Sequence, residues 1–305
     1  MVISEQRQED LHKAIDLYLK IYQEGKVELK SEFSKYSGYY YITNEPIRDI
    51  FDIRTKYENK KILSVLAGGD HIFEMIFKGA SNVDTFDINA LLEYYAIGFK
   101  KRAIECLDYQ EYLDLFDFSY DGLENKYYNI KTEIEDYVVK NMDEEYNWFW
   151  KEIKHILKEY GYEASAFHFA LNLKQKDFNK PSFLKSEDNY KILQSKLQSA
   201  TINFQQANIM ELRIKFSKYD LIYLSNILDY FEPEYAKRLL TDIYNNNLYK
   251  NGQIIFTDLC SYFDEEIYES VPGAEKIKRW FDNPGLPCYG LKKRRIKWLE
   301  LNNVK

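Results

Sequence analysis

The chain has 305 residues, of which 45% are apolar, so it can bury one large core or two smaller ones. Its 49 acidic residues against 42 basic ones give a net charge of −7, which argues against a dedicated nucleic-acid-binding protein. Its three cysteines lie far apart in the sequence and predict neither a disulfide framework nor a metal site. No signal peptide and no long apolar span are present in the sequence, so we expect a reducing, cytoplasmic compartment.

The N-terminal part of the chain has the pattern of helices. Residues 5–24 carry apolar side chains at helical spacing, and Gly25 is a suitable stop. Pro46 is well placed to begin a second helix that runs to about Lys56. We therefore expect residues 1–58 to form a helical cap before the first strand.

The next stretch, residues 61–89, organises the rest of the chain. Ile62–Leu66 reads as a buried strand, and a small-residue loop, Ala67–Asp70, follows it. His71–Lys78 has helical periodicity, and Val83–Phe86 reads as a second strand that ends at the acidic Asp87. This order of strand, glycine turn, helix, strand and acid is typical of the nucleotide-binding half of a doubly wound α/β fold.

The residue types of this stretch favour one class of ligand. Glycines allow a close approach of the backbone to a ligand, and Asp87 is placed to accept hydrogen bonds from two ribose hydroxyls. Asp70 at the helix start would repel a phosphate but would suit a ligand with an amino or cationic group. S-adenosylmethionine fits that description. The alternative is an ordinary strand–helix turn with a solvated Asp70.

A long helical segment is expected after Asp87. Apolar side chains between Leu91 and Ile104 form a continuous helical stripe, and a short helix follows Asp108. Residues 121–171 look helical and are too long for a simple strand-to-helix connection. We expect a helical insertion at about residues 119–199, covering the carboxyl ends of the strands and including a helix over Ser186–Leu197.

The C-terminal part is predicted to alternate strands with helices. The expected strands are Thr201–Phe204, Tyr219–Ser225, Gln253–Thr257 and Arg295–Leu301. The expected helices are Pro233–Tyr244 and residues 262–283, and a turn is expected at Asn251–Gly252. The fold class is therefore α/β, with a Rossmann-like, doubly wound sheet over residues 59–305.

Four polar loops follow the expected strands. Because the carboxyl ends of parallel strands meet at one edge of a sheet, we expect these loops to converge on a ligand. The loops are Ala67–Asp70, Asp87–Asn89, Gln206–Ile209 and Ser225–Tyr230.

The sequence of these segments resembles class I S-adenosylmethionine-dependent transferases. The resemblance is carried by L-A-G-G-D, T-F-D-I-N, A-N-I, Y-D-L-I-Y-L-S-N-I-L-D-Y and N-G-Q-I-I-F-T. More narrowly, the run that begins D-I-N-A-L-L-E-Y-Y at Asp87 is similar to the S-adenosylmethionine:diacylglycerol 3-amino-3-carboxypropyl transferases of betaine-lipid synthesis. The resemblance covers roughly residues 60–118 and 200–258.

The resemblance implies roles at matching positions. The glycine loop would approach the methionine part of the cofactor, Asp87 would hold the ribose, and Asn208 would lie at the adenine edge. The cofactor-binding set it implies is Ala67, Gly68, Gly69, Asp70, Asp87, Ile88, Asn89, Asn208, Ile209, Ser225 and Asn226. Asp229 and Tyr230 are the catalytic candidates, as groups that orient the acceptor or take its proton. For Asp229 the alternative is an acid stabilised by a helix N-terminus.

Three functional hypotheses follow. The first is transfer of the 3-amino-3-carboxypropyl group to a small-molecule or lipid acceptor with release of methylthioadenosine, the second is methyl transfer on the same scaffold, and the third is nucleoside binding without chemistry. The basic run Lys292–Arg295 would meet a phosphate or an anionic membrane surface, or is simply a solvated edge. The sequence specifies neither the acceptor nor the oligomeric state.

Overall fold

The structure is a computed structural model of the whole chain. It describes residues 3–24, 36, 45, 47, 51, 57–116, 132–162, 180–212, 216–258, 274–278 and 297–302. The chain divides into two compact units, each built from segments that are separate in the sequence. The first unit contains Met1–Glu58, Leu66–Ser81 and Asp87–Gln206, and the second contains Asn59–Val65, Asn82–Phe86 and Ala207–Lys305. The expected boundary at residue 58 stays a prediction.

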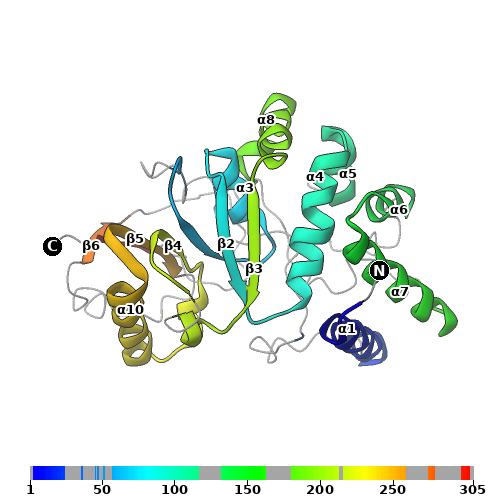
Figure 1. The fold of residues 1–305 in the computed structure, drawn as a ribbon, viewed down its shortest axis with the longest axis horizontal. Coiled ribbons are helices and arrows are strands. Elements are labelled where there is room, and N and C mark those ends of the chain that lie inside the picture. The colour runs from blue at the N-terminus through cyan, green and yellow to red at the C-terminus, as the bar shows by residue number, and fades with distance from the viewer. Residues whose placement is uncertain are drawn as a thin grey trace, which may run out of the picture. The chain divides into compact units, whose positions relative to one another are not determined.

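The first unit is mainly helical (Figure 1). Its helices are α1 (Glu5–Glu24), α3 (Asp70–Phe77), the π-helix η2 (Glu93–Lys100), α4 (Lys101–Cys106), α5 (Tyr109–Phe116), α6 (Thr132–Lys140), α7 (Glu144–Glu159), the short 3₁₀ turn η6 (Ser182–Leu184) and α8 (Glu187–Leu197). The predicted helix over residues 5–24 is confirmed, as is the short helix after Asp108. Ser186 begins α8 as predicted, because its hydroxyl accepts the Asn189 N–H and caps the first turn.

The segment after Asp87 differs from the expected continuous α-helix. Residues of η2 are wound as a π-helix, in which the N–H of residue i+5 bonds to the carbonyl of residue i, and the Lys101 N–H accordingly donates to the Ala96 carbonyl. The predicted apolar stripe is nonetheless buried along the whole segment from Leu91 to Ile104. An additional aromatic residue, Tyr94, is also fully buried in this segment.

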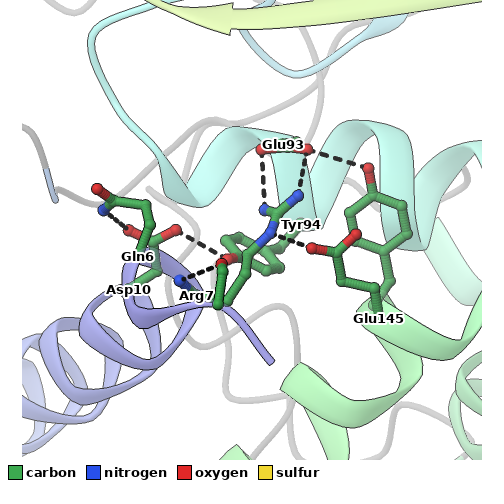
Figure 2. A network of polar contacts seen from close by, with 8 residues as sticks. Gln6, Arg7, Asp10, Glu93, Tyr94 and Glu145 are labelled. Carbon is green, nitrogen blue, oxygen red and sulfur yellow. Dashed lines mark hydrogen bonds and ion pairs between the residues drawn. The ribbon is translucent and has the colours of Figure 1, made fainter. Parts of the chain in front are cut away.

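A polar junction joins α1 to η2 and α7 within the first unit, and Figure 2 shows it at close range. The Arg7 guanidinium donates to both carboxylate oxygens of Glu93, at 2.9 and 2.8 Å, and also to Glu145. The guanidinium carbon of Arg7, Cζ, lies 4.7 Å from the centre of the Tyr94 ring. The Tyr94 hydroxyl donates to the Asp10 carboxylate at 2.8 Å. This junction fixes the N-terminal helix by charge and by aromatic packing together.

The second unit is built around strands (Figure 1). They are β1 (Ile62–Val65), β2 (Asn82–Asp87), β4 (Tyr219–Tyr223), β5 (Leu248–Asp258), β6 (Ala274–Lys278) and β7 (Lys297–Asn302), while β3 (Thr201–Gln206) ends the first unit. The helical elements of the second unit are the 3₁₀ turns η7 (Ile209–Glu211) and η8 (Ile227–Tyr230) and the helix α10 (Pro233–Asn247). Pro233 lies in the first turn of α10, where its fixed φ suits a helix start.

The sheet has the doubly wound order that the sequence predicts. Its strands follow one another as β3-β2-β1-β4-β5-β7-β6, and β1 pairs in parallel with both β2 and β4. β4 pairs in parallel with β5, whereas β7 runs antiparallel to β5 and β6. The strand order therefore reverses between β1 and β4, which is where ligands bind in open α/β sheets, beyond the carboxyl ends of the strands.

Two predicted elements are wrong in the C-terminal part. Residues 274–278, which lie inside the helix predicted over 262–283, form β6, because β7 supplies a strand edge for them to pair with. Asn251–Gly252 does not end a strand but lies within β5. Tyr219 of β4 pairs with Leu248 and Leu221 pairs with Gln253, so β5 has extra residues between these two pairs and forms a bulge. A Cβ at Gly252 would lie 3.0 Å from the Tyr219 carbonyl oxygen, so this glycine permits the bulge.

Several predictions fall outside the described residues. They are most of the helix from Pro46 to Lys56, of which only Ile47 and Phe51 are described, both as helical, together with the parts of the insertion at 121–131 and 163–171 and the basic run Lys292–Arg295. Among the described residues, every helix is too short or too polar to cross a bilayer.

Candidate functional site

The turn after β1 has a tightly defined backbone. The Gly69 N–H donates to the Leu66 carbonyl at 2.9 Å, which closes the turn. Ala67 has a φ of 42° and Gly69 a φ of 87°, so both adopt the left-handed conformation. A residue with a Cβ adopts this conformation at a cost, and such residues concentrate at functional sites.

Asp87 is tied to this turn from the end of β2. One carboxylate oxygen accepts the Ala67 N–H at 3.2 Å, and the other accepts the Asn89 N–H at 3.0 Å. Burial raises the pKa of Asp87 to about 6, and the hydrogen bonds from the Asn89, Ala67 and Ile88 N–H groups oppose that rise. The carboxylate is therefore held in one orientation, with further lone pairs on each oxygen for a ligand.

One donor of the turn has no partner within the described part of the chain. The neighbouring N–H groups of Ala67 and Gly69 donate to Asp87 and Leu66, whereas the Gly68 N–H donates to no atom of the described residues. A backbone N–H without a protein partner beside a carboxylate offers a donor and an acceptor to the same ligand.

Asp70 at the start of α3 is paired inside the protein. Its side chain and that of Lys100 are both 0% exposed, and the Lys100 Nζ lies 2.6 Å from an Asp70 carboxylate oxygen. The same Nζ donates to the Gly68 carbonyl at 3.1 Å. Burial lowers the pKa of Lys100, and the charge of Asp70 opposes that effect. The cation beside Asp70 in this structure is therefore Lys100, a residue that the sequence did not single out.

Ile88 and Asn89 have structural partners. The Asn89 side-chain oxygen accepts the Leu91 N–H at 3.1 Å, which caps the start of the following helical segment. The Ile88 carbonyl accepts from the Gln206 side chain at 3.0 Å. These bonds fix the backbone on both sides of the Asp87–Asn89 loop.

Asn208 and Ile209 follow β3 in the second unit. The Asn208 side-chain oxygen accepts the Met210 N–H at 3.0 Å, and the Glu211 carboxylate accepts the Asn208 N–H at 2.9 Å, which makes a capping box. Ile209 is buried. The Asn208 oxygen therefore already serves the backbone, while its NH₂ group bonds to no atom in the described part of the chain.

The segment after β4 contains the remaining predicted residues. Ser225 has a φ of 54°, and its hydroxyl donates to the Asn226 side-chain oxygen at 3.3 Å. Asp229 and Tyr230 lie in η8, and Tyr230 is 39% exposed. The structure thus places a second strained, polar turn after a strand next to the reversal of strand order.

Predicted residues are brought together in part. Ala67, Asp87 and Asn89 are joined by hydrogen bonds in the first unit, and Ser225 contacts Asn226 in the second. Sequence reasoning missed Lys100, because Lys100–Arg102 reads as the solvated end of an amphipathic helix. The signal that could have indicated a buried Lys100 is the apolar helical stripe on either side of it, which includes Phe99 and Ala103.

Comparisons with known proteins give only distant likenesses of structure. No family model matches the chain, and no curated protein matches its sequence. Its structure is similar to that of the rRNA methyltransferase AviRa from Streptomyces viridochromogenes, with 9% identity, a TM-score of 0.40, and coverage of 85% of this chain and 82% of that one. It is also similar to a TehB-like SAM-dependent methyltransferase from Corynebacterium glutamicum, with 10% identity, a TM-score of 0.39, and coverage of 85% of this chain and 89% of that one. For the magnesium protoporphyrin IX methyltransferase from Synechocystis, with bound SAM, the identity is 9%, the TM-score is 0.38, and the coverage is 84% of this chain and 75% of that one. At these values the likenesses assign neither a family nor a reaction.

Proposed function

We propose that the chain is an S-adenosylmethionine-dependent transferase. The observation that carries the proposal is Asp87, whose two carboxylate oxygens are each held by one backbone N–H at the edge of the glycine turn. Two neighbouring acceptor oxygens in one plane match the two adjacent hydroxyls of a ribose. The Gly68 N–H beside them supplies a donor for another part of the same ligand.

The charges around the turn favour this ligand over a dinucleotide. In a phosphate-binding turn the backbone N–H groups are left for the anion. Here the Ala67 N–H is taken by the Asp87 carboxylate, which lies beside the turn. A phosphate would face this carboxylate, whereas S-adenosylmethionine carries a sulfonium and an ammonium group.

When bound, S-adenosylmethionine supplies a sulfonium whose three attached carbons are all electrophilic. Which carbon reacts is decided by which one the site points at the acceptor. From the sequence resemblance we propose that Ser225 and Asn226 meet the sulfonium, and that Asp229 and Tyr230 orient the acceptor or take its proton.

The sequence resemblance around Asp87 favours transfer of the 3-amino-3-carboxypropyl group. Methyl transfer is the second candidate, because the strand order β3-β2-β1-β4-β5-β7-β6 suits it equally well. The acceptor is a small molecule or a lipid in either case.

Calorimetric titration with S-adenosylmethionine tests the cofactor. Replacing Asp87 by Ala removes a charged acceptor, so we expect an affinity loss of roughly 10- to 100-fold. The matched control is Asp84→Ala in the same strand, whose carboxylate accepts from the Tyr219 hydroxyl instead. Wild-type chain that bound no S-adenosylmethionine would overturn the proposal, and equal binding by wild type and Asp87→Ala would overturn the placement of the ribose.

Mass spectrometry of the nucleoside product tests the reaction. The chain is incubated with S-adenosylmethionine and a cell extract that supplies acceptors. Methylthioadenosine above the no-enzyme control supports aminocarboxypropyl transfer, and S-adenosylhomocysteine assigns the chain to methyl transfer. Binding without either product supports a nucleoside-binding protein that has no transfer chemistry.

A further inference from the structure

A buried charge lies directly behind the glycine turn. The Lys100 ammonium contacts Asp70 and the Gly68 carbonyl, and both charged side chains are fully enclosed. We propose that Lys100 is a positioning residue that holds the turn in the shape that binds S-adenosylmethionine. The inference rests on the proposed function and extends it to a residue that makes no contact with solvent.

Stability alone is a weak reason to place this pair here. Removing two charges from water is costly, and an apolar pair of similar volume often stabilises a core as well or better. The surroundings are apolar as well as enclosed: the Lys100 Nζ lies 5.4 Å from the centre of the Phe116 ring. Burial, followed by the nearby charges of Asp70 and Tyr190, raises the pKa of the fully buried Tyr112 well above its usual value, so its hydroxyl stays neutral.

The hydrogen bond from Lys100 to the Gly68 carbonyl links the buried Asp70–Lys100 pair to the glycine turn. Asp87 holds the Ala67 N–H on one side of the Gly68 residue, and Lys100 holds the Gly68 carbonyl on the other. The Gly68 N–H, which has no partner among the described residues, lies between these two anchors. Two side chains from different parts of the chain thus fix the direction of the donor that a ligand would use.

The role of Asp70 follows from the same geometry. Burial lowers the pKa of Lys100, and the Asp70 carboxylate, 2.6 Å from its Nζ, opposes that effect and so favours the ammonium that donates to Gly68. Asp70 therefore acts on the turn through Lys100 as well as through its own position at the start of α3.

The test compares two double variants that are matched in charge and size. Asp70→Asn/Lys100→Met and Asp70→Asn/Lys100→Gln both remove the buried charges, so neither leaves an unpaired ion. Only Gln retains N–H donors that can bond to the Gly68 carbonyl. Each variant is measured by thermal unfolding and by calorimetric titration with S-adenosylmethionine.

We expect the two double variants to unfold at similar temperatures but to bind differently. The Gln variant should bind about tenfold more tightly than the Met variant, as expected for one retained hydrogen bond to a charged or preorganised group. Arg7→Met is a control at the other end of η2: it should lower the unfolding temperature and leave the affinity unchanged.

The outcomes separate this inference from the proposed function. If the wild type binds S-adenosylmethionine and both double variants bind it equally, the role of Lys100 is wrong while the proposed function stands. If the wild type does not bind, the proposed function is wrong and the inference falls with it. An affinity loss in Arg7→Met as large as in the Met variant would indicate a general effect of stability and would also overturn the inference.

Discussion

The Asp87 carboxylate accepts a hydrogen bond from the Ala67 N–H at 3.2 Å, so the acid that ends β2 is bound to the turn that follows β1. The same carboxylate accepts from Asn89 with its other oxygen. Asp87 is therefore both a part of the candidate site and a support of its backbone, and substitutions there will change both properties.

Replacing Gly69 by Ala should destabilise the fold. A Cβ would lie 2.9 Å from the Phe73 ring and 3.1 Å from the Ala96 Cβ, in addition to the strain of a φ of 87°. We expect the free energy of unfolding to fall by about 2–4 kcal/mol, since overpacking adds to a left-handed penalty of about 1 kcal/mol. Chemical denaturation measures it.

Gly161 provides the matched control for this prediction. Its φ is 81°, but an added Cβ would meet no atom within 4 Å. Gly161→Ala should therefore show the backbone penalty alone, about 1 kcal/mol. Equal losses in the two variants would mean that the contact with Phe73 and Ala96 relaxes without cost.

The affinity for S-adenosylmethionine should fall as the pH is lowered from 7 to 5. The pKa of Asp87 is raised to about 6, so its ionised fraction, which accepts best from hydroxyls, drops about tenfold across this range. Because the shift is upward, the contribution of Asp87 to folding stability runs the other way: it is complete at low pH and is lost as the pH rises through about 6.

Titration calorimetry at several pH values checks this dependence. In Asp87→Asn the affinity should be lower than that of the wild type at pH 7, should be close to it at pH 5, and should lose the change between these two values. A variant that kept the same pH dependence as the wild type would show that another group is responsible.

Replacing Arg7 by Met should destabilise the first unit. Arg7 is 16% exposed and Glu93 18%, and the guanidinium bonds to both oxygens of Glu93 (Figure 2). Burial lowers the pKa of Arg7, but the hydrogen bond and charge of Glu93 outweigh it and raise the pKa above its usual range. Loss of these charge-assisted bonds should cost about 1.5–3 kcal/mol in a denaturation experiment.

Arg102→Met is the comparison for this junction. Arg102 is 27% exposed and has two partners: Asp143, which is 74% exposed, and Glu105, three residues further along, at 3.3 Å. The pair with Asp143 is screened by water, and the pair with Glu105 is a single-contact pair between near neighbours in the sequence. We expect a loss below about 1 kcal/mol. If Arg102→Met cost as much as Arg7→Met, enclosure of the Arg7–Glu93 pair would not be the source of its contribution.

Ser225→Gly should separate strain from function after β4. The φ of 54° at Ser225 is costly for a residue with a Cβ, so glycine should raise the free energy of unfolding by about 0.5–1 kcal/mol. Ser225→Ala keeps the strain and removes only the hydroxyl that donates to Asn226. Both variants should bind S-adenosylmethionine more weakly, if the hydroxyl acts as proposed. If Ser225→Gly raised the free energy of unfolding and left the affinity for S-adenosylmethionine unchanged, Ser225 would have a structural role only.

Local patterns in the sequence were sufficient for most single elements. Strands β1 and β4, helix α1 and the capped helix α8 lie where apolar periodicity and end signals predict them. Such elements are encoded within a few neighbouring residues, by the period of the apolar positions and by the residues that satisfy the chain ends. The same reasoning placed Asp87 at the end of a strand beside a glycine turn.

What the sequence by itself determined was therefore the order of the strands and helices from β1 to β5 and the acidic, glycine-containing loops between them. Only the tertiary structure decided which partners those elements have. Residues 274–278 form a strand that pairs with β7, and the buried Lys100 is the counter-ion of Asp70. Both outcomes depend on groups far apart in the sequence, because a strand edge needs another strand and a buried charge needs an opposite one. No local period carries that information, and it appears only when the chain has folded.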